Sequence, residues 1–188
     1  TFLRGDQTYA EPGGGGLIPI AQYSGSSYTD NVIANGWITD TYENYVMDYL
    51  ITPVTNNVGI NMVLYDSSGN ISSGNEYDYA MIGIQTSNGS TQTHYNYGQN
   101  SWLLSPGCNN DTTRVGVTGR LLWVHPRLSN RRTTIIVNQR ILDSGVTNRP
   151  YFGNLEFKAT NQLTGFYMNA SSGQIANWQF RMYGVKNS

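Results

Sequence analysis

The chain has 188 residues, with 11 Lys and Arg against 12 Asp and Glu, and its formal net charge is −1. This length suits one domain that closes a core without disulfides, and the near-neutral charge gives no electrostatic reason to expect nucleic acid or an anionic membrane as a partner. Charged residues make up only 12% of the chain, whereas Gly (21) and Tyr (14) are abundant, so we expect a surface of uncharged hydrogen-bonding groups and aromatic rings.

The first 16 residues join a short polar peptide to a run of glycines, Gly13 to Gly16. No initiator methionine precedes Thr1, so we expect the chain to be a fragment or a processed form of a longer protein. A segment of this composition cannot bury a core and is typical of a flexible linker. The sequence therefore predicts a linker over residues 1–16 that joins an upstream body, followed by one domain over residues 17–188.

After residue 17, apolar and polar residues alternate with a period of two, which is typical of half-buried strands. Strands are expected at Ile18–Tyr23, Tyr45–Ile51, Val58–Leu64, Tyr77–Ile84, Val115–Trp123, Ile135–Ile141, Leu155–Thr160, Phe166–Met168 and Trp178–Tyr183. The nearest approach to a helical pattern is Thr39–Tyr49, and its Tyr and Val content favours a strand. Many short strands separated by Gly, Asn and Pro predict an all-β fold, an antiparallel β-sandwich of jelly-roll type.

No apolar run reaches the ~18 residues that a membrane-spanning helix needs, so no membrane insertion is expected. Cys108 is the only cysteine, which excludes an internal disulfide. It follows Pro106-Gly107 in a turn-like context, and no arrangement of His, Asn and Asp marks it as a nucleophile, so we expect an inert thiol.

Four segments of the chain resemble the C-terminal domain of bacteriophage tail-fibre proteins. Residues 2–9, FLRGDQTY, followed by the glycine run, resemble the FLRGDGTW segment that precedes that domain, with Gln7 and Tyr9 as departures. Residues 42–46 (YENYV) resemble its YDEYLI strand, residues 116–126 (GVTGRLLWVHP) its GVSGTITLFNP strand, and residues 171–186 its SSGNIASGTFKLYGLK ending. The four matches keep their order along the chain, whereas Asp66–Asn110 shows only a faint match, so we expect that segment to be specific to this protein.

The resemblance implies a fibre tip domain that binds a receptor on the host cell. It also implies a homotrimer attached to an upstream fibre shaft, located in the virion as part of a tail fibre or a capsid fibre. A binding surface of uncharged polar groups and rings suits glycans, because sugars are neutral polyols with apolar faces. The sequence leaves open whether the receptor is a glycan.

The segment Thr86–Trp102 is the best candidate for a binding site. It is a long polar stretch without an obvious strand pattern, and long loops are often functional. Aromatic rings stack on sugars, and side-chain amides hydrogen-bond to hydroxyls in both directions. The candidate receptor-binding residues are His94, Tyr95, Asn96, Tyr97 and Trp102. The alternative is that these rings are buried against the sandwich or a neighbouring subunit, and the Leu-Leu pair after Trp102 favours the core for that residue.

Catalysis is poorly supported, and we expect no enzyme activity, no catalytic residue, no metal site and no cofactor. His94 and His125 are the only histidines, and neither has a neighbour at metal-ligand spacing. A glycosidase needs only two carboxyl groups at a suitable distance, but Glu76 and Asp78 flank Tyr77 on one strand, where such groups usually face solvent. The leading hypothesis is therefore non-catalytic receptor recognition. A structural role in capsid decoration or tail assembly is the alternative, and a polysaccharide depolymerase module is a third, weaker one.

Overall fold

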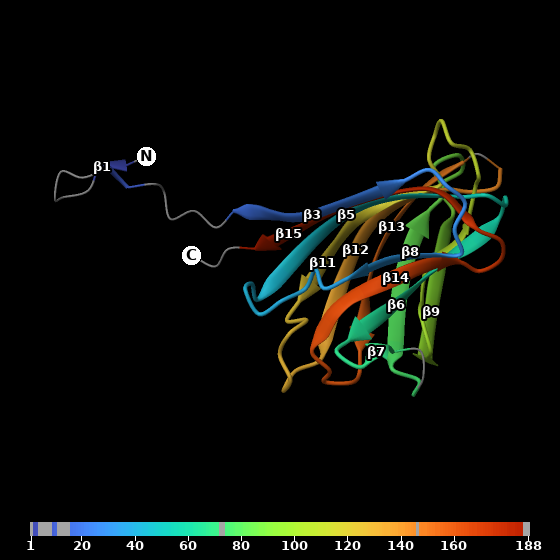
Figure 1. The fold of residues 1–188 in the computed structure, drawn as a ribbon. Helices are drawn as coiled ribbons and strands as arrows, with labels where there is room; N and C mark the ends of the chain where they lie inside the picture. The colour runs from blue at the N-terminus through green and yellow to red at the C-terminus, as the bar shows by residue number, and fades with distance from the viewer. Residues whose placement is uncertain (1, 4–8, 11–15, 72–73, 146, 186–188) are drawn as a thin grey trace.

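The computed structural model describes residues 2–3, 9–10, 16–71, 74–145 and 147–185, and within these ranges the chain is built from strands and turns alone. Two antiparallel sheets face each other, which confirms the all-β, antiparallel sandwich predicted from the alternation (Figure 1). In the N-terminal segment, β1 (Phe2–Leu3) pairs with β2 (Tyr9–Ala10). The rest of the predicted linker, apart from Gly16, lies outside the described residues. No described segment is a helix long and apolar enough to cross a membrane.

The larger sheet has eight strands in the order β3-β15-β5-β11-β12-β13-β8-β9. Their bounds are β3 (Leu17–Gly25), β15 (Ile175–Val185), β5 (Asn44–Pro53), β11 (Val117–Val124), β12 (Thr133–Leu142), β13 (Asn148–Phe157), β8 (Tyr77–Ile84) and β9 (Thr91–Gln99). The smaller sheet has the order β10-β6-β14-β4, with β7 paired to β6. Its bounds are β10 (Trp102–Cys108), β6 (Val58–Asp66), β14 (Leu163–Ala170), β4 (Asn31–Asn35) and β7 (Gly69–Asn70).

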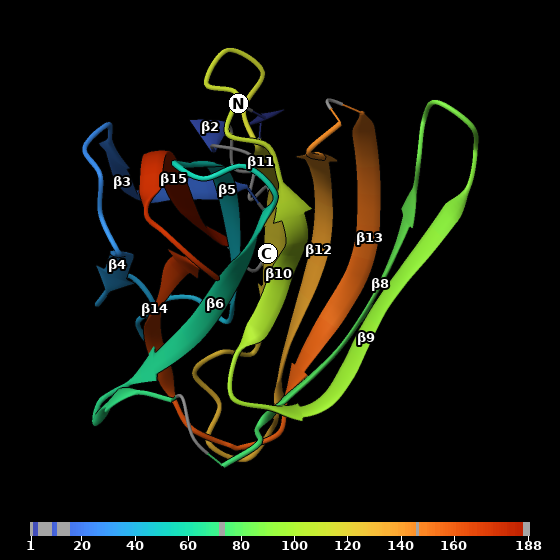
Figure 2. The same ribbon diagram turned by 90° about the vertical axis from the view of Figure 1, so that its right-hand side faces the viewer.

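The strand order is that of a jelly roll, in which a long hairpin folds over on itself to make two sheets. The antiparallel pairs β3–β15, β4–β14, β5–β11 and β6–β10 run from the outermost to the innermost partners of that hairpin. The pair β8–β9 is inserted between β6 and β10, and the pair β12–β13 between β11 and β14. Both insertions add to the larger sheet, which therefore extends past the smaller one on the side of β9 (Figure 2).

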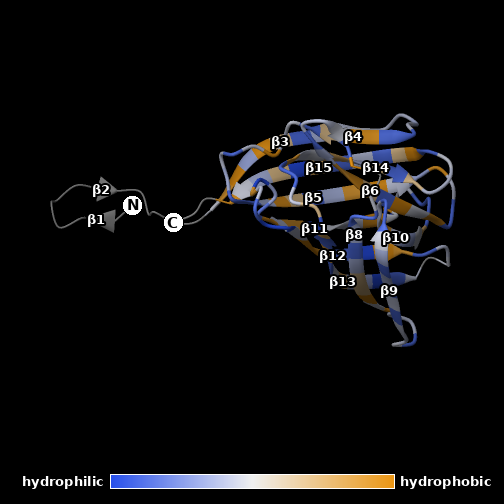
Figure 3. Cartoon of the chain, turned by 90° about the horizontal axis from the view of Figure 1, so that it is seen from below, coloured by the Kyte–Doolittle hydropathy of each residue, from blue (hydrophilic) through white to orange (hydrophobic). Residues whose placement is uncertain are grey.

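The core lies between the sheets and follows the alternation of the sequence. In β15, Trp178, Phe180 and Met182 are buried, and Gln179 and Arg181 lie on the opposite side. Burying a large apolar side chain stabilises the fold by about 1.5–3 kcal/mol. Hydrophobic and hydrophilic residues alternate along the strands in the same way across both sheets (Figure 3). Below, the inner face of the larger sheet is the face that carries these buried residues, and the outer face is the opposite one.

The predicted strand ranges agree with the structure except at a few ends. Val115 has a φ of 63° and precedes β11, because its N–H bonds back to the carbonyl of Asp111 at 3.0 Å and closes a turn. The strand predicted at residues 155–160 is displaced: β13 begins at Asn148 and ends at Phe157. Strands β4, β7, β9 and β10 have no counterpart among the predicted ranges. β10 contains Pro106 and Gly107 and is interrupted by two register shifts, so its alternation is broken.

Candidate functional site

The predicted binding segment is largely a strand, so the expectation of a long loop is wrong. Residues 91–99 form β9, which pairs with β8 along its length, and Trp102 begins β10. The actual loop is short: the N–H of Gln85 bonds to the carbonyl of Ser90 at 2.8 Å, and Gly89 supplies the positive φ of 71° that this turn needs. β9 is an edge strand with little apolar core to face, so its polar sequence carries no hydrophobic alternation.

The pairing with β8 places the candidate residues on different faces of the sheet. His94 lies opposite Met81 and Tyr95 opposite Ala80. Met81 is buried in the core, whereas Ala80 is exposed on the outer face. Since side chains alternate along a strand, His94 belongs to the inner face and Tyr95 to the outer face.

Asn96 and Tyr97 divide in the same way. Asn96 lies opposite the buried Tyr79, on the side of His94, and is itself exposed. Tyr97 lies on the outer face with Tyr95, and the centroids of the two rings are 6.3 Å apart. The strand bulges after Tyr97, where Gly98 has a φ of 61° and donates its N–H to Oδ1 of Asp78 at 2.6 Å. The structure therefore does not bring the four side chains of β9 into one site.

Trp102 does not belong to a surface site, and its place among the candidates is wrong. The side chain is 0% exposed, packed in the core at the start of β10 together with Leu104. A ring of this size stabilises the sandwich by burial and cannot reach a ligand in solvent.

His94 lines a polar cleft on the inner side of the sheet, with a volume of about 240 Å³. We call it the polar cleft; the end of β10 and the connections that follow β5 and β12 also line it. The lining residues are Asn57, Gln92, His94, Pro106, Gly107, Ile141, Asp143, Ser144, Arg149 and Tyr151.

The polar cleft lies at the end of the sandwich opposite the first residues of the domain. Leu17 pairs with Val185 at one end, and Val185 pairs with Asn44. β5 runs from Asn44 to Pro53, so the turn after it, which contains Asn57, lies at the far end (Figure 1).

Hydrogen bonds fix both the orientation and the proton positions of the cleft side chains. Oε1 of Gln92 accepts from Nη1 of Arg149 at 2.5 Å and from the hydroxyl of Tyr151 at 3.0 Å. An amide oxygen only accepts, so the single hydroxyl proton of Tyr151 is used in this bond. The contact of 3.3 Å between that hydroxyl and Nε2 of His94 must then be donated by the histidine. Neutral His94 therefore carries its proton on Nε2, and Nδ1 is left as an acceptor without a protein partner among the described residues.

The charges in the polar cleft balance each other. Nη2 of Arg149 lies 2.6 Å from Oδ2 of Asp143, and the two side chains are only 20% and 13% exposed. Burial and the nearby Arg149 charge lower the pKa of His94 below its usual range, so the ring is neutral near pH 7. The cleft thus offers a free donor, the Nε2 amide of Gln92, and a free acceptor, Nδ1 of His94, without net charge.

Two glycines make room for this arrangement. Gly83 lies opposite both Tyr151 and Gln92 in the sheet, and a Cβ there would be 2.4 Å from the ring of Tyr151. The ring can lie over β8 only because position 83 has no side chain. Gly107 lines the cleft, and a Cβ at this position would lie 3.0 Å from Oδ1 of Asn57, so glycine keeps the space open.

No family model matches the chain. Neither a curated protein nor a solved structure matches it. What the protein does is therefore argued from the geometry of its surfaces.

The other face of β9 forms an aromatic groove of about 470 Å³. Tyr95 and Tyr97 are 66% and 73% exposed, and Ile82 and Phe152 beside them are each 48% exposed. The remaining lining residues are Ala80, Met81, Thr93 and Gly153. In contrast to the polar cleft, this surface is predominantly apolar and contains no charged side chain among its lining residues.

Asp78 and Cys108, two groups considered for catalysis, make structural contacts. Asp78 accepts from the N–H of Gly98 and lies 3.3 Å from Nζ of Lys158, so it stabilises the β9 bulge. Burial raises the pKa of Cys108 to about 12, in agreement with the inert thiol predicted from its context. Within the part of the chain that the structure describes, no group of three His, Cys, Asp or Glu side chains could hold a metal ion.

The side chains that bond to one another around His94 were not among the residues predicted from the sequence: Gln92, Asp143, Arg149 and Tyr151. They come from segments far apart in the sequence, and only the folded sheet brings them together. One pair could have been found from the sequence. Asp143 and Arg149 flank the short connection between two strands, and hairpin geometry places the residues at its two ends side by side. The pairing of β9 with Gly83, which adds Gln92 and His94, had no such signal.

Proposed function

We propose that the protein is the receptor-binding tip domain of a bacteriophage fibre and that it binds a sugar of a host-surface glycan in the polar cleft, without catalysis. The observation that carries the proposal is the ordered network of Gln92, His94, Arg149 and Tyr151. Hydrogen-bonded networks that are partly buried, as this one is, hold their side chains in one arrangement, which is what selective recognition of a polar ligand requires.

The chemistry of the cleft fits two neighbouring hydroxyls of one sugar ring. One hydroxyl can donate to Nδ1 of His94, while the next accepts from the Nε2 amide of Gln92. The absence of net charge favours a neutral sugar over an ion. A volume of about 240 Å³ is below the range of about 300–1,000 Å³ usual for larger ligands, so we expect a single ring to bind.

The fold and its orientation support the same proposal. Jelly rolls occur in viral proteins and in lectins, although a fold alone does not determine function. The resemblance to tail-fibre domains implies a shaft that enters at the N-terminal end, and the cleft lies at the opposite end of the sandwich from Leu17. A fibre tip would present that end to the cell.

A glycan array with the domain tests this proposal directly. We expect selective binding to a small set of glycans, and loss of that binding in His94→Ala and Gln92→Ala. Gln99→Ala is a matched control, because Gln99 lies on the same strand and its side-chain amide donates to the carbonyl of Tyr97 at 3.0 Å, away from the lining of the cleft. The proposal fails if the array shows no selective binding, or if both cleft variants bind as well as the control.

A second candidate function, assembly, is favoured by the aromatic groove. Exposed apolar surfaces that combine several rings often mark protein interfaces. We propose that the groove is covered by a neighbouring subunit in a homotrimer, as the resemblance to fibre proteins implies. In a capsid-decorating or tail-accessory domain, the same groove would be the main functional surface.

A depolymerase is the least supported function. Asp143 is the only carboxylate among the described residues that line the polar cleft, and it is paired with Arg149. Glycosidases use two carboxyl groups that flank the scissile bond. We therefore expect host polysaccharide to keep its chain length during incubation with the domain.

A further inference from the structure

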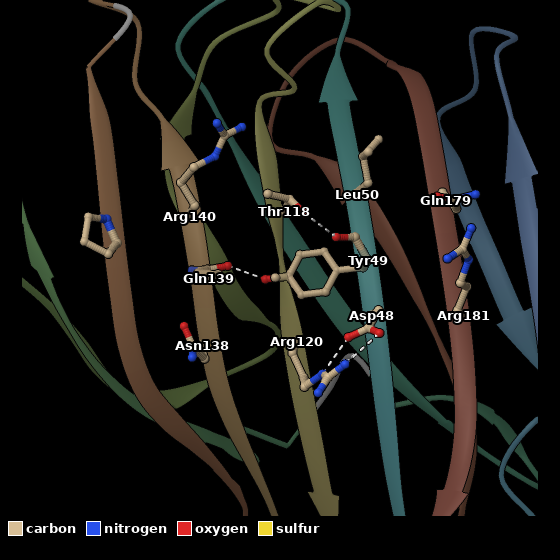
Figure 4. A pocket seen from close by; sticks show the side chains of 12 residues that line it. Asp48, Tyr49, Leu50, Thr118, Arg120, Asn138, Gln139, Arg140, Gln179 and Arg181 are labelled. Atoms are coloured by element: carbon tan, nitrogen blue, oxygen red, sulfur yellow. Dashed lines mark hydrogen bonds and ion pairs between the residues drawn. The ribbon is translucent and has the colours of Figure 1, made fainter. Parts of the chain in front are cut away.

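A separate groove on the outer face of the larger sheet gathers three arginines from neighbouring strands (Figure 4). It crosses β15, β5, β11 and β12, and its volume is about 570 Å³. We name it the arginine groove. Its lining residues are Asp48, Tyr49, Leu50, Thr118, Gly119, Arg120, Asn138, Gln139, Arg140, Pro150, Gln179 and Arg181.

Asp48 is the only carboxylate among the residues that line the arginine groove. Asp48 lies opposite both Arg120 and Arg181 in the sheet. It is already held by Arg120, whose Nε and Nη2 bond to its two oxygens at 2.6 and 2.9 Å. Arg181 is exposed and has no ion-pair partner among the residues that the structure describes. Its five N–H donors are therefore available to a ligand.

Arg140 is held in place by neutral groups only. Nη2 bonds to the carbonyls of Arg114 and Val115, the latter at 2.8 Å, and Nη1 lies 3.4 Å from Oδ1 of Asn148. Its Nε is buried and has no partner in the described part of the chain. The guanidinium is thus positioned without being neutralised. Arg140 lies opposite Thr118 on β11 and Pro150 on β13, so no carboxylate faces it across the sheet.

We propose that the arginine groove binds the carboxylate of an acidic sugar, such as a uronic acid. Arginine recognises carboxylates through paired N–H donors, and Arg181 has all of its donors free. The groove is far larger than a small inorganic ion requires. Around the arginines it presents the amides of Asn138 and Gln179 and the hydroxyl of Thr118, which suit the hydroxyls of a sugar ring.

The inference rests on the proposed function only in that the ligand is taken to be a glycan. The groove and the polar cleft lie on opposite faces of the larger sheet and share no lining residue. Each site can therefore be tested while the other is intact. An acidic polysaccharide would engage the arginine groove, and a neutral sugar would engage the cleft.

Saturation-transfer difference NMR with defined oligosaccharides tests the assignment. The probes are galacturonic acid oligomers, galactose oligomers of the same length and inorganic sulfate. We expect saturable binding of the acidic oligomer and about tenfold weaker binding in Arg181→Gln, since a hydrogen bond to a charged group contributes on this scale. Arg132→Gln is the matched control. Arg132 is exposed, does not line the groove, and its Nη1 lies 2.5 Å from Oε1 of Glu156.

Three results would overturn the inference: no saturable binding of the acidic oligomer, equal affinity for the neutral oligomer, or unchanged affinity in Arg181→Gln. Competition by sulfate at the same affinity would also overturn the assignment to a sugar. His94→Ala separates the two proposals. If the arginine groove is a site of its own, this variant keeps its affinity for the acidic oligomer even if neutral glycans do not bind at all.

Discussion

The two faces of strand β9 differ in almost every physical property although their residues alternate along one sequence. On the inner face, Gln92 and His94 belong to a hydrogen-bonded network in a polar cleft. On the outer face, Tyr95 and Tyr97 are largely exposed and lie beside Phe152 in an apolar groove. Residues that are neighbours in the chain therefore belong to different surfaces, and a function assigned to the segment as a whole would combine two unrelated sites.

The side chains of this polar edge strand are placed by the strands around it. The strand has no buried apolar face of its own, so its partners decide what each side chain does. Gly83 on β8 admits Tyr151 on the inner side, whereas Ala80 and Ile82 leave a shallow apolar surface on the outer side. The predictions below test this division, beginning with the largest expected effect.

The largest effect on stability is expected for Trp102, which is fully buried in the core. Trp102→Ala should lower the free energy of unfolding by about 3–5 kcal/mol, because it leaves a large cavity in the core. Tyr97→Ala, on the exposed face of β9, should change it by about 0.5 kcal/mol or less. Urea denaturation of the two variants measures both values. Similar losses would mean that Tyr97 is packed rather than exposed.

Gly83→Ala should disrupt the inner face of β9 and leave the outer face intact. The added methyl group would clash with the ring of Tyr151, and overpacking of this kind costs about 1–3 kcal/mol. Displacing Tyr151 should also abolish sugar binding in the polar cleft. The control is Ile82→Ala, the adjacent exposed residue, which we expect to keep sugar binding. A Gly83→Ala variant with normal stability and binding would contradict the role given to this glycine.

Much of the fold could be predicted from the sequence, because alternation reports burial wherever one face of a strand is apolar. The strand predicted at Val58–Leu64 is β6, which buries Ile60, Met62 and Leu64. The candidate site could be predicted only in part. His94, Tyr95 and Tyr97 are accessible, but their separation by the pleat depends on the pairing of β9 with β8, which nothing in the polar sequence of β9 reveals.

The arginine groove could not be predicted from the sequence at all. Arg120, Arg140 and Arg181 are spread over 62 residues of sequence, and each looks like an ordinary solvent-facing position in its own strand. They come together because β15, β5, β11 and β12 are neighbours in the sheet, an order set by the jelly-roll topology. Long-range pairing of this kind has no local sequence signal.

Replacing both tyrosines of the outer face by alanine should weaken self-association and leave the inner face unchanged. Tyr95→Ala with Tyr97→Ala removes the two most exposed rings of the aromatic groove, which we propose is covered by a neighbouring subunit. Light scattering at several concentrations should show a trimer for the unmodified chain and a smaller mass for the double variant, at similar thermal stability. Loss of glycan binding with an unchanged mass would place the sugar on the tyrosines instead of in the cleft.

The smallest effect is expected from the titration of His94. Burial and the Arg149 charge lower its pKa in the folded protein, whereas the unfolded chain has the ordinary value of about 6.5. Between these two values the unfolded state binds more protons, so the contribution of His94 to stability is complete above about pH 6.5 and decreases as the pH falls through this window. Protonation also converts Nδ1 from an acceptor to a donor, so sugar binding should weaken in the same range.

NMR titration of the ring protons, assigned with His94→Gln, gives the pKa of His94. The urea midpoints at about pH 5 and about pH 8 should differ less in His94→Gln than in the unmodified chain. A pKa at or above the ordinary value would show that the ring is not enclosed by the network of the inner face.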